Sequence, residues 1–204
     1  MHGIGALRRF AARPMAERCQ LCAAEIATEH QHLVDPENHR LLCACRACAI
    51  LFDDSGVTRY RRVPTEVREL AALEIGDAFW NSLAIPSGLV FFFRSSTPGG
   101  VVAFYPSPAG PTQANIDEEV WRELSELDRS IESLRPDVEA LLVNRVRGVR
   151  EYFIVPIDAC YRLAGILRQT WQGFSGGDTA WLRVGEFFED LRRRARPQGA
   201  VNHA

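Results

Sequence analysis

The stretch Cys19-Gln20-Leu21-Cys22 and the later run Cys43-Ala44-Cys45-Arg46-Ala47-Cys48 decide how the first part of this chain folds. Five of the six cysteines lie in these two stretches, with a polar, histidine-bearing segment between them. A Cys-x-x-Cys turn directs two thiolates at one ion, and two such turns joined by a hairpin make a tetrahedral four-sulfur site. The pattern therefore predicts a small zinc-ribbon-like metal module over residues 17–62.

The predicted ligands are Cys19, Cys22, Cys45 and Cys48, because each pair then has the two-residue spacing of a knuckle turn. Cys43 is the alternative. On a strand it has the same parity as Cys45, so it either replaces Cys45 as a ligand or supports the ligands from beside the site.

Zinc is the expected metal, because four thiolates on two knuckles most often hold zinc in a closed, structural site. Iron is the alternative, since rubredoxin-type iron uses the same tetrahedral geometry. Ala23 and Ala49 stand where a rubredoxin knuckle has glycine, which disfavours iron. The fifth cysteine keeps an iron–sulfur cluster open as well.

Three histidines, His30, His32 and His39, lie between the two cysteine pairs. One of them could replace a cysteine ligand. We expect them instead at the surface or in support of the ligands, because five thiols already exceed the needs of a four-coordinate ion.

Composition excludes some classes of function. The chain has 204 residues and a net charge of −2, and all its permanent positive charges are arginines. Arg59, Arg61 and Arg62 surround Tyr60 and could follow a phosphate backbone, but the acidic balance favours a solvated strand or a protein contact. No apolar run reaches membrane-spanning length and residues 1–16 lack a secretory signal, so we expect a cytoplasmic protein that binds no membrane.

The remainder predicts an α+β domain over residues 63–196, between a flexible leader, 1–16, and a tail, 197–204. Apolar runs predict strands at 87–95, 100–105, 138–146 and 151–155, and a loop at 106–111. Three-and-four spacing predicts helices at 116–134, 156–167 and 178–196, the first capped by Asn115. This order indicates an antiparallel sheet with helices packed on one side.

No catalytic constellation stands out in this domain. Cys160 lies on an apolar helix face and is expected in the core. Asp158, Glu186 and Glu189 follow ordinary amphipathic spacing, and the glycines of 173–177 lack the lysine and spacing of a phosphate-binding loop. We therefore expect a protein that is not an enzyme.

Two sets of segments together resemble a bacterial family of unknown function, found mainly in actinobacteria. They are Cys19–Cys22, His32–Asp35 and Arg40–Phe52, and then Pro136–Val143, Val155–Tyr161 and Trp171–Gly177. Genes of that family tend to lie beside those of oxygen-tolerant NiFe hydrogenases. The resemblance covers nearly the whole chain and implies an accessory role in hydrogenase maturation, assembly or electron transfer, with a hydrogenase subunit or assembly factor as the partner. The resemblance assigns no catalytic residues to this sequence.

The favoured hypothesis is a non-enzymatic, zinc-binding accessory protein that presents a surface to a protein partner. A rubredoxin-like electron-transfer protein is the first alternative. A nucleic-acid-binding zinc ribbon is the second.

Overall fold

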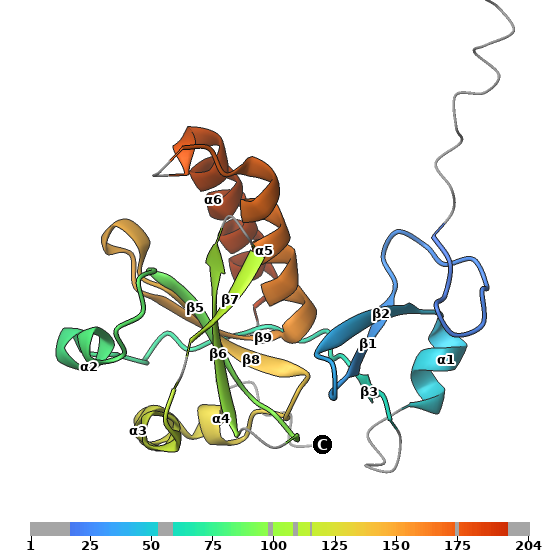
Figure 1. Cartoon of the computed structure of the whole chain (residues 1–204), viewed down its shortest axis with the longest axis horizontal. Helices are drawn as coiled ribbons and strands as arrows, with labels where there is room; N and C mark the ends of the chain where they lie inside the picture. The colour runs from blue at the N-terminus through green and yellow to red at the C-terminus, as the bar shows by residue number, and fades with distance from the viewer. Residues whose placement is uncertain are drawn as a thin grey trace, which may run out of the picture.

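The computed structural model describes residues 17–52, 59–97, 100–107, 110–114, 116–173 and 176–195. The predicted leader, tail and Asn115 cap lie outside these residues. The chain forms a small N-terminal sheet and a larger α+β unit, so the predicted fold class is confirmed (Figure 1). Within the described residues, no helix is long and apolar enough to cross a membrane.

The N-terminal sheet is a hairpin with one added strand. Strands β1 (Gln31–Asp35), β2 (Arg40–Ala44) and β3 (Arg61–Arg62) pair antiparallel in the order β2-β1-β3. The hairpin turn follows Asp35, whose carboxylate accepts hydrogen bonds from the Glu37 backbone N–H and the Asn38 side chain. A short helix, α1 (Arg46–Leu51), follows β2 directly.

The larger unit is a six-stranded antiparallel sheet in the order β4-β9-β8-β5-β6-β7. Its strands are β4 (Arg68–Glu69), β5 (Leu89–Arg94), β6 (Val101–Ser107), β7 (Gly110–Ala114), β8 (Glu139–Asn144) and β9 (Glu151–Pro156). Four of them match predicted strands. Part of the loop expected at 106–111 is instead the hairpin between β6 and β7.

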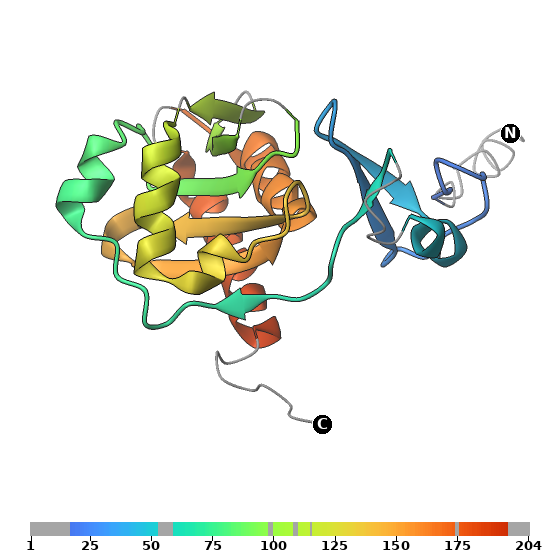
Figure 2. The same cartoon turned by 90° about the horizontal axis from the view of Figure 1, so that it is seen from below.

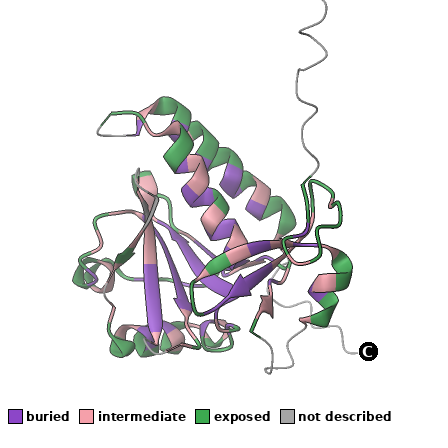
Figure 3. Cartoon of the chain, turned by 45° about the vertical axis from the view of Figure 1, so that its right-hand side comes forward, coloured by how far each residue is buried: buried purple, intermediate pink, exposed green. Residues whose placement is uncertain are grey.

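Helices cover both faces of this sheet, whereas the sequence predicted them on one side only. Helices α5 (Ile157–Thr170) and α6 (Gly177–Arg194) pack on one face. Helices α2 (Asp77–Ser82), α3 (Glu118–Leu127) and α4 (Arg129–Glu132) lie on the other. The physical reason is the burial of β5 on both faces: Phe91 and Phe93 belong to the core on the first face, Val90 and Phe92 to the core on the second, and all four are buried. Figure 3 shows the central strands of the sheet largely in the colour of buried residues.

The helix expected over 116–134 is interrupted at Asp128. This residue has an extended backbone, with a φ of −153°, and its carboxylate accepts a hydrogen bond from the Ser130 N–H at 2.7 Å. An aspartate that caps a new helix in this way competes with continuation of the old one. The apolar stripe still reaches the core, because Leu124 and Ile131 are both buried.

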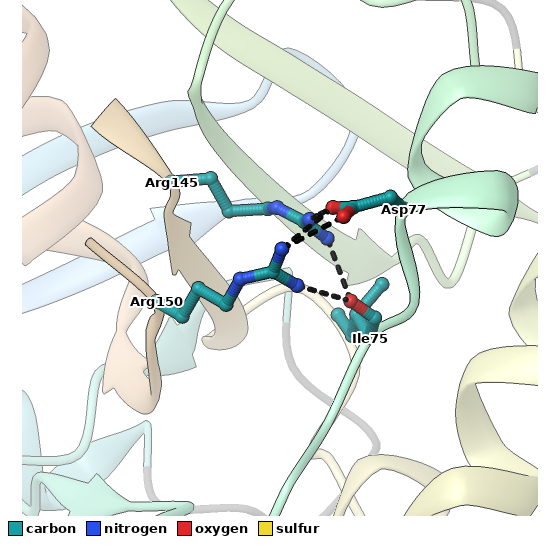
Figure 4. A network of polar contacts seen from close by, with 4 residues as sticks. All are labelled: Ile75, Asp77, Arg145 and Arg150. Carbon is teal, nitrogen blue, oxygen red and sulfur yellow. Dashed lines mark hydrogen bonds and ion pairs between the residues drawn. The ribbon is translucent and has the colours of Figure 1, made fainter. Parts of the chain in front are cut away.

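Asp77 fixes the start of α2 to the β8–β9 connection (Figure 4). Its carboxylate accepts hydrogen bonds from Arg145 and Arg150, and the Ile75 carbonyl accepts from Arg145 at 2.7 Å. The Arg145 guanidinium also lies 5.0 Å from the ring centroid of Trp80. This network anchors a helix that has no fully buried residue of its own.

The N-terminal sheet packs against the larger unit (Figure 2). Val34 and Val63 belong to the same core as α5 and α6. Arg61 Nε lies 3.1 Å from the buried Asp137 Oδ2, and the Tyr161 hydroxyl donates to the His39 carbonyl at 3.2 Å. The contact therefore combines shared apolar burial with specific polar bonds.

Candidate metal centre

The first cysteine pair lies in a tight turn closed by backbone hydrogen bonds. The Ala23 N–H donates to the Cys19 carbonyl and the Cys19 N–H donates to the Ala24 carbonyl, both at 2.8 Å. Ala23 has a φ of 62°, a left-handed conformation that costs a non-glycine residue about 1 kcal/mol. The chain thus builds with alanine the turn for which glycine is usual. The absence of glycine is accordingly a weaker argument against iron than the sequence suggested.

The second pair lies at the start of α1. Cys45 is the N-cap residue, and its sulfur accepts a hydrogen bond from the Cys48 N–H at 3.4 Å. Cys48 is the third helical residue, so both side chains are on the same side of the first turn. The second pair is therefore presented by a helix start rather than by a second hairpin knuckle.

Gln20 joins the first turn to β2. Its backbone N–H donates to the Cys43 carbonyl at 2.9 Å, and its side-chain oxygen accepts from the Cys43 N–H at 2.7 Å. Because Cys43 is two residues before Cys45, these bonds hold the turn beside the start of α1. They bring the two cysteine pairs together.

The sulfurs of Cys19, Cys22, Cys45 and Cys48 all lie within 4.8 Å of one another. The Cys22 and Cys45 sulfurs are 3.7 Å apart. Zinc–sulfur bonds of about 2.3 Å in a tetrahedron imply sulfur–sulfur distances of about 3.8 Å. The four cysteines are therefore close enough to bind one metal ion. Their identity as its ligands stays a prediction.

The four thiols differ in their tendency to ionise. Burial alone raises the pKa of Cys19, but the backbone amides of Cys45, Cys22 and Leu21 outweigh burial and lower this pKa to about 6. Interactions with the Cys22 and Cys45 sulfurs raise the pKa of Cys48 to about 12. Cys19 is thus readily ionised even without metal. Ionising Cys48 beside it is unfavourable unless a cation is present.

The structure places Cys43 outside this four-sulfur group. Its sulfur lies within 4.8 Å of ring nitrogens of His30 and His32. His39 is apart from both groups, in the hairpin turn, with its ring centroid 5.7 Å from that of Phe93. The sequence named all these residues but gave no reason to group Cys43 with two of the histidines.

The arginines considered for nucleic-acid binding have partners in the chain itself. Arg59 pairs with Asp35 at 2.8 Å, Arg61 contacts Asp137, and Arg62 Nε donates to the Gln31 side chain at 3.2 Å. Two of the three positive charges, those of Arg59 and Arg61, are therefore paired with carboxylates of this chain.

The other residues considered for a catalytic role have neighbours that indicate a structural role instead. Cys160 is fully buried, and burial raises its pKa well above the ordinary value. Glu186 pairs with Arg183 on the surface of α6, and Glu189 is exposed. Asp158, in the first turn of α5, contacts His32, a contact that sequence spacing did not reveal.

Residues 18–195 match the model of DUF5947, a protein family of unknown function. The chain belongs to the DUF5947 family. The match begins just before Cys19 and includes both the four-cysteine group and the six-stranded sheet. No curated protein and no solved structure matches this DUF5947 chain.

Proposed function

We propose that this protein is a non-enzymatic accessory protein whose four-cysteine site holds one structural zinc ion. The observation that carries the proposal is the grouping of four sulfurs within 4.8 Å, two on a knuckle and two on a helix start. Four protein thiolates fill a tetrahedral ion and leave no position for a substrate. The metal would then serve to fold the N-terminal sheet rather than to catalyse a reaction.

The proposed partner is a NiFe-hydrogenase subunit or assembly factor in the cytoplasm. This part rests on the family resemblance, while the metal rests on the four sulfurs. Clustered Cys-x-x-Cys pairs suit a reducing compartment, where thiols remain available to metals.

Metal analysis tests the site. The protein would be expressed in medium containing both iron and zinc, and its metal content and visible spectrum measured. We expect about one zinc ion per chain at the four cysteines and no colour. A red protein with stoichiometric iron would instead support the rubredoxin-like electron carrier, because the same four thiolates would then form a redox centre.

Serine variants assign the metal to its ligands. Cys19→Ser and Cys48→Ser should lose the zinc and lower the thermal stability of the N-terminal sheet, because metal binding supplies folding free energy. Cys160→Ala is the matched control, since Cys160 is buried in the core of the larger unit. It should keep its zinc. Unchanged metal content in the first two variants would contradict the proposal.

Co-expression tests the partner. The protein would be produced together with hydrogenase subunits and separated by size-exclusion chromatography, with the zinc-free Cys19→Ser variant as the control. Co-elution of wild type with a subunit, lost in the variant, is the expected result. Separate elution of wild type from every subunit and assembly factor would contradict the hydrogenase link but leave the zinc site untouched.

A further inference from the structure

A second group of metal-binding side chains lies beside the four-cysteine site. His30, His32 and Cys43 each offer one ligand atom, and these atoms lie within 4.8 Å of one another. None of the three belongs to the four-sulfur group. Two imidazoles and one thiolate are donors that first-row transition metals such as zinc, cobalt, nickel and copper accept, whereas magnesium and calcium prefer oxygen.

The hairpin itself brings His32 and Cys43 together. They are directly opposite each other in the β1–β2 register. The N–H and carbonyl of Cys43 bond to Gln20, and the His32 carbonyl accepts from Val63, so the two residues exchange no backbone bonds. Side chains of such a non-hydrogen-bonded pair approach more closely than those of a bonded pair.

Each histidine is held through its Nδ1 atom. His32 Nδ1 lies 2.8 Å from Asp158 Oδ2. His30 Nδ1 lies 2.9 Å from the Ala27 carbonyl and 3.3 Å from Glu17 Oε2. Metal-binding histidines commonly donate one ring N–H to a carboxylate or carbonyl, which fixes the ring and leaves the other nitrogen for the ion. Here that nitrogen is Nε2 on both rings.

His30 provides the observation that points to a ligand. Its side chain is only 9% exposed, and its Nε2 atom is buried without a hydrogen-bond partner among the described residues. A buried polar nitrogen without a hydrogen-bond partner is unfavourable, so its placement calls for a reason. Its ring lies 4.7 Å, centroid to centroid, from that of His32. A bound ion would satisfy the nitrogen.

We propose that His30, His32 and Cys43 bind a second divalent transition-metal ion, distinct from the ion of the four cysteines. Three protein ligands leave one tetrahedral position for water or for a ligand from another molecule. His32 is 27% exposed, so one side of the site is accessible to solvent. The second ion would accordingly be exchangeable, in contrast to a closed four-thiolate ion.

The site would also span the two parts of the molecule. His32 is on β1 of the N-terminal sheet, and Asp158, which orients it, is on α5 of the larger unit. Binding at Nε2 would strengthen the His32–Asp158 contact, because the metal makes the Nδ1–H a better donor. Occupancy would therefore stiffen the junction between the two sheets.

Cobalt titration of the full chain tests the proposal. Protein containing one zinc ion per chain would be titrated with Co²⁺, with absorption spectra recorded and zinc measured in the same samples. We expect one further equivalent of Co²⁺ with a sulfur-to-cobalt charge-transfer band and no release of zinc. A cobalt signal matched by equal zinc loss would come from the four-cysteine site and overturn the proposal.

Variants locate the second ion. His30→Gln, His32→Gln and Cys43→Ser should each lose the additional cobalt equivalent and keep the zinc, with circular dichroism unchanged. His39→Asn is the matched control: it removes a hairpin histidine outside the group, and asparagine tolerates the positive φ of 48° there. It should bind cobalt as wild type does. Retention of the second equivalent in all three ligand variants would overturn the proposal.

Asp158→Asn provides a test that leaves every ligand in place. Loss of a carboxylate that orients a histidine typically weakens metal binding about 10–100-fold. We expect a weakening of that size for the second cobalt ion only. Equal cobalt affinity in this variant and wild type would contradict the assigned role of Asp158.

Discussion

Ala23 shows how far one residue can depart from its preferred conformation to complete a turn. Its φ of 62° turns the chain back after Ala23, so that the Ala24 carbonyl accepts a hydrogen bond from the Cys19 N–H. Alanine in this region is strained because its Cβ atom crowds the backbone. The strain is tolerated because the turn holds two cysteines beside the start of α1.

Replacing Ala23 by glycine should therefore stabilise the protein. Relief of the strain outweighs the greater freedom of glycine in the unfolded chain, so we expect a gain of up to about 1 kcal/mol in the free energy of unfolding. Denaturant titration of the zinc-loaded protein measures it.

Ala49→Gly is the control, because Ala49 also follows the second cysteine of its pair but lies inside α1. Glycine in a helix costs about 1 kcal/mol relative to alanine. The same substitution should thus have opposite signs at the two positions. A loss of stability at both would refute the strain at Ala23.

At the scale of elements, the Arg61–Asp137 contact joins β3 to the segment just before β8. The Asp137 side chain is fully buried, and its other oxygen accepts a hydrogen bond from the Ser96 N–H at 2.9 Å. Arg61→Met should leave a buried carboxylate without its cation and cost about 3 kcal/mol. Denaturant unfolding gives the value.

Arg183→Met removes an arginine whose pair with Glu186 is exposed on both sides. Exposed pairs contribute well under about 1 kcal/mol, so this variant should unfold almost as wild type does. Similar losses in both variants would mean that burial of Asp137 is not what makes the Arg61 contact important.

Asp77 makes the attachment of α2 depend on pH. Hydrogen bonds from Arg150, together with the charges of Arg150 and Arg145, lower the pKa of Asp77. A carboxylate with a lowered pKa in the folded state stabilises the protein above its unfolded pKa, and this stabilisation is lost as the pH falls through the folded pKa. Asp77→Asn should therefore be less stable than wild type at neutral pH.

The difference between wild type and Asp77→Asn should begin to shrink as the pH falls below about 4, the pKa of an aspartate in the unfolded chain, and should disappear once the pH has passed the lower folded pKa of Asp77. Unfolding curves at a series of pH values measure it. Asp117→Asn serves as the comparison, since Asp117 makes no capping hydrogen bond through its side chain. A pH-independent difference for Asp77→Asn would exclude an ionic anchor.

The sequence predicted some of these elements well and others poorly, for physical reasons. Spacing alone named the four cysteines whose sulfurs come together, and continuous apolar runs predicted β5 and β8. Those runs also contained an unused signal: strands apolar at every position require cover on both faces. The break at Asp128 depends on one capping hydrogen bond, and the position of Cys43 beside His32 depends on the register of the hairpin. Hydrophobic periodicity indicates neither of them.

At the scale of the whole molecule, we expect the two sheets to depend on metal to different degrees. The small core of the N-terminal sheet includes Cys19, Leu33 and Ala49, so its packing depends on the cysteine site. The six-stranded sheet is buried between two layers of helices, and the four cysteines lie outside it. Removal of metal should therefore unfold one part and spare the other.

Hydrogen exchange before and after chelation checks this prediction. Amides of β1, β2 and α1 should exchange much faster in the metal-free protein, while those of β5 and β8 should stay protected, because structural zinc supplies folding free energy only where it is bound. A uniform increase across both sheets would show that the metal stabilises the chain as one cooperative unit.

The two edges of the six-stranded sheet differ from its centre in a way that bears on self-association. One edge, β4, has only two residues, and the other, β7, contains Pro111, which has no backbone N–H. Short or proline-bearing edges offer an incoming strand few partners for backbone pairing. The long apolar strands at the centre are thereby shielded from the edge-to-edge stacking that leads to fibrils, and another chain would have to meet this molecule through side chains rather than by extending its sheet.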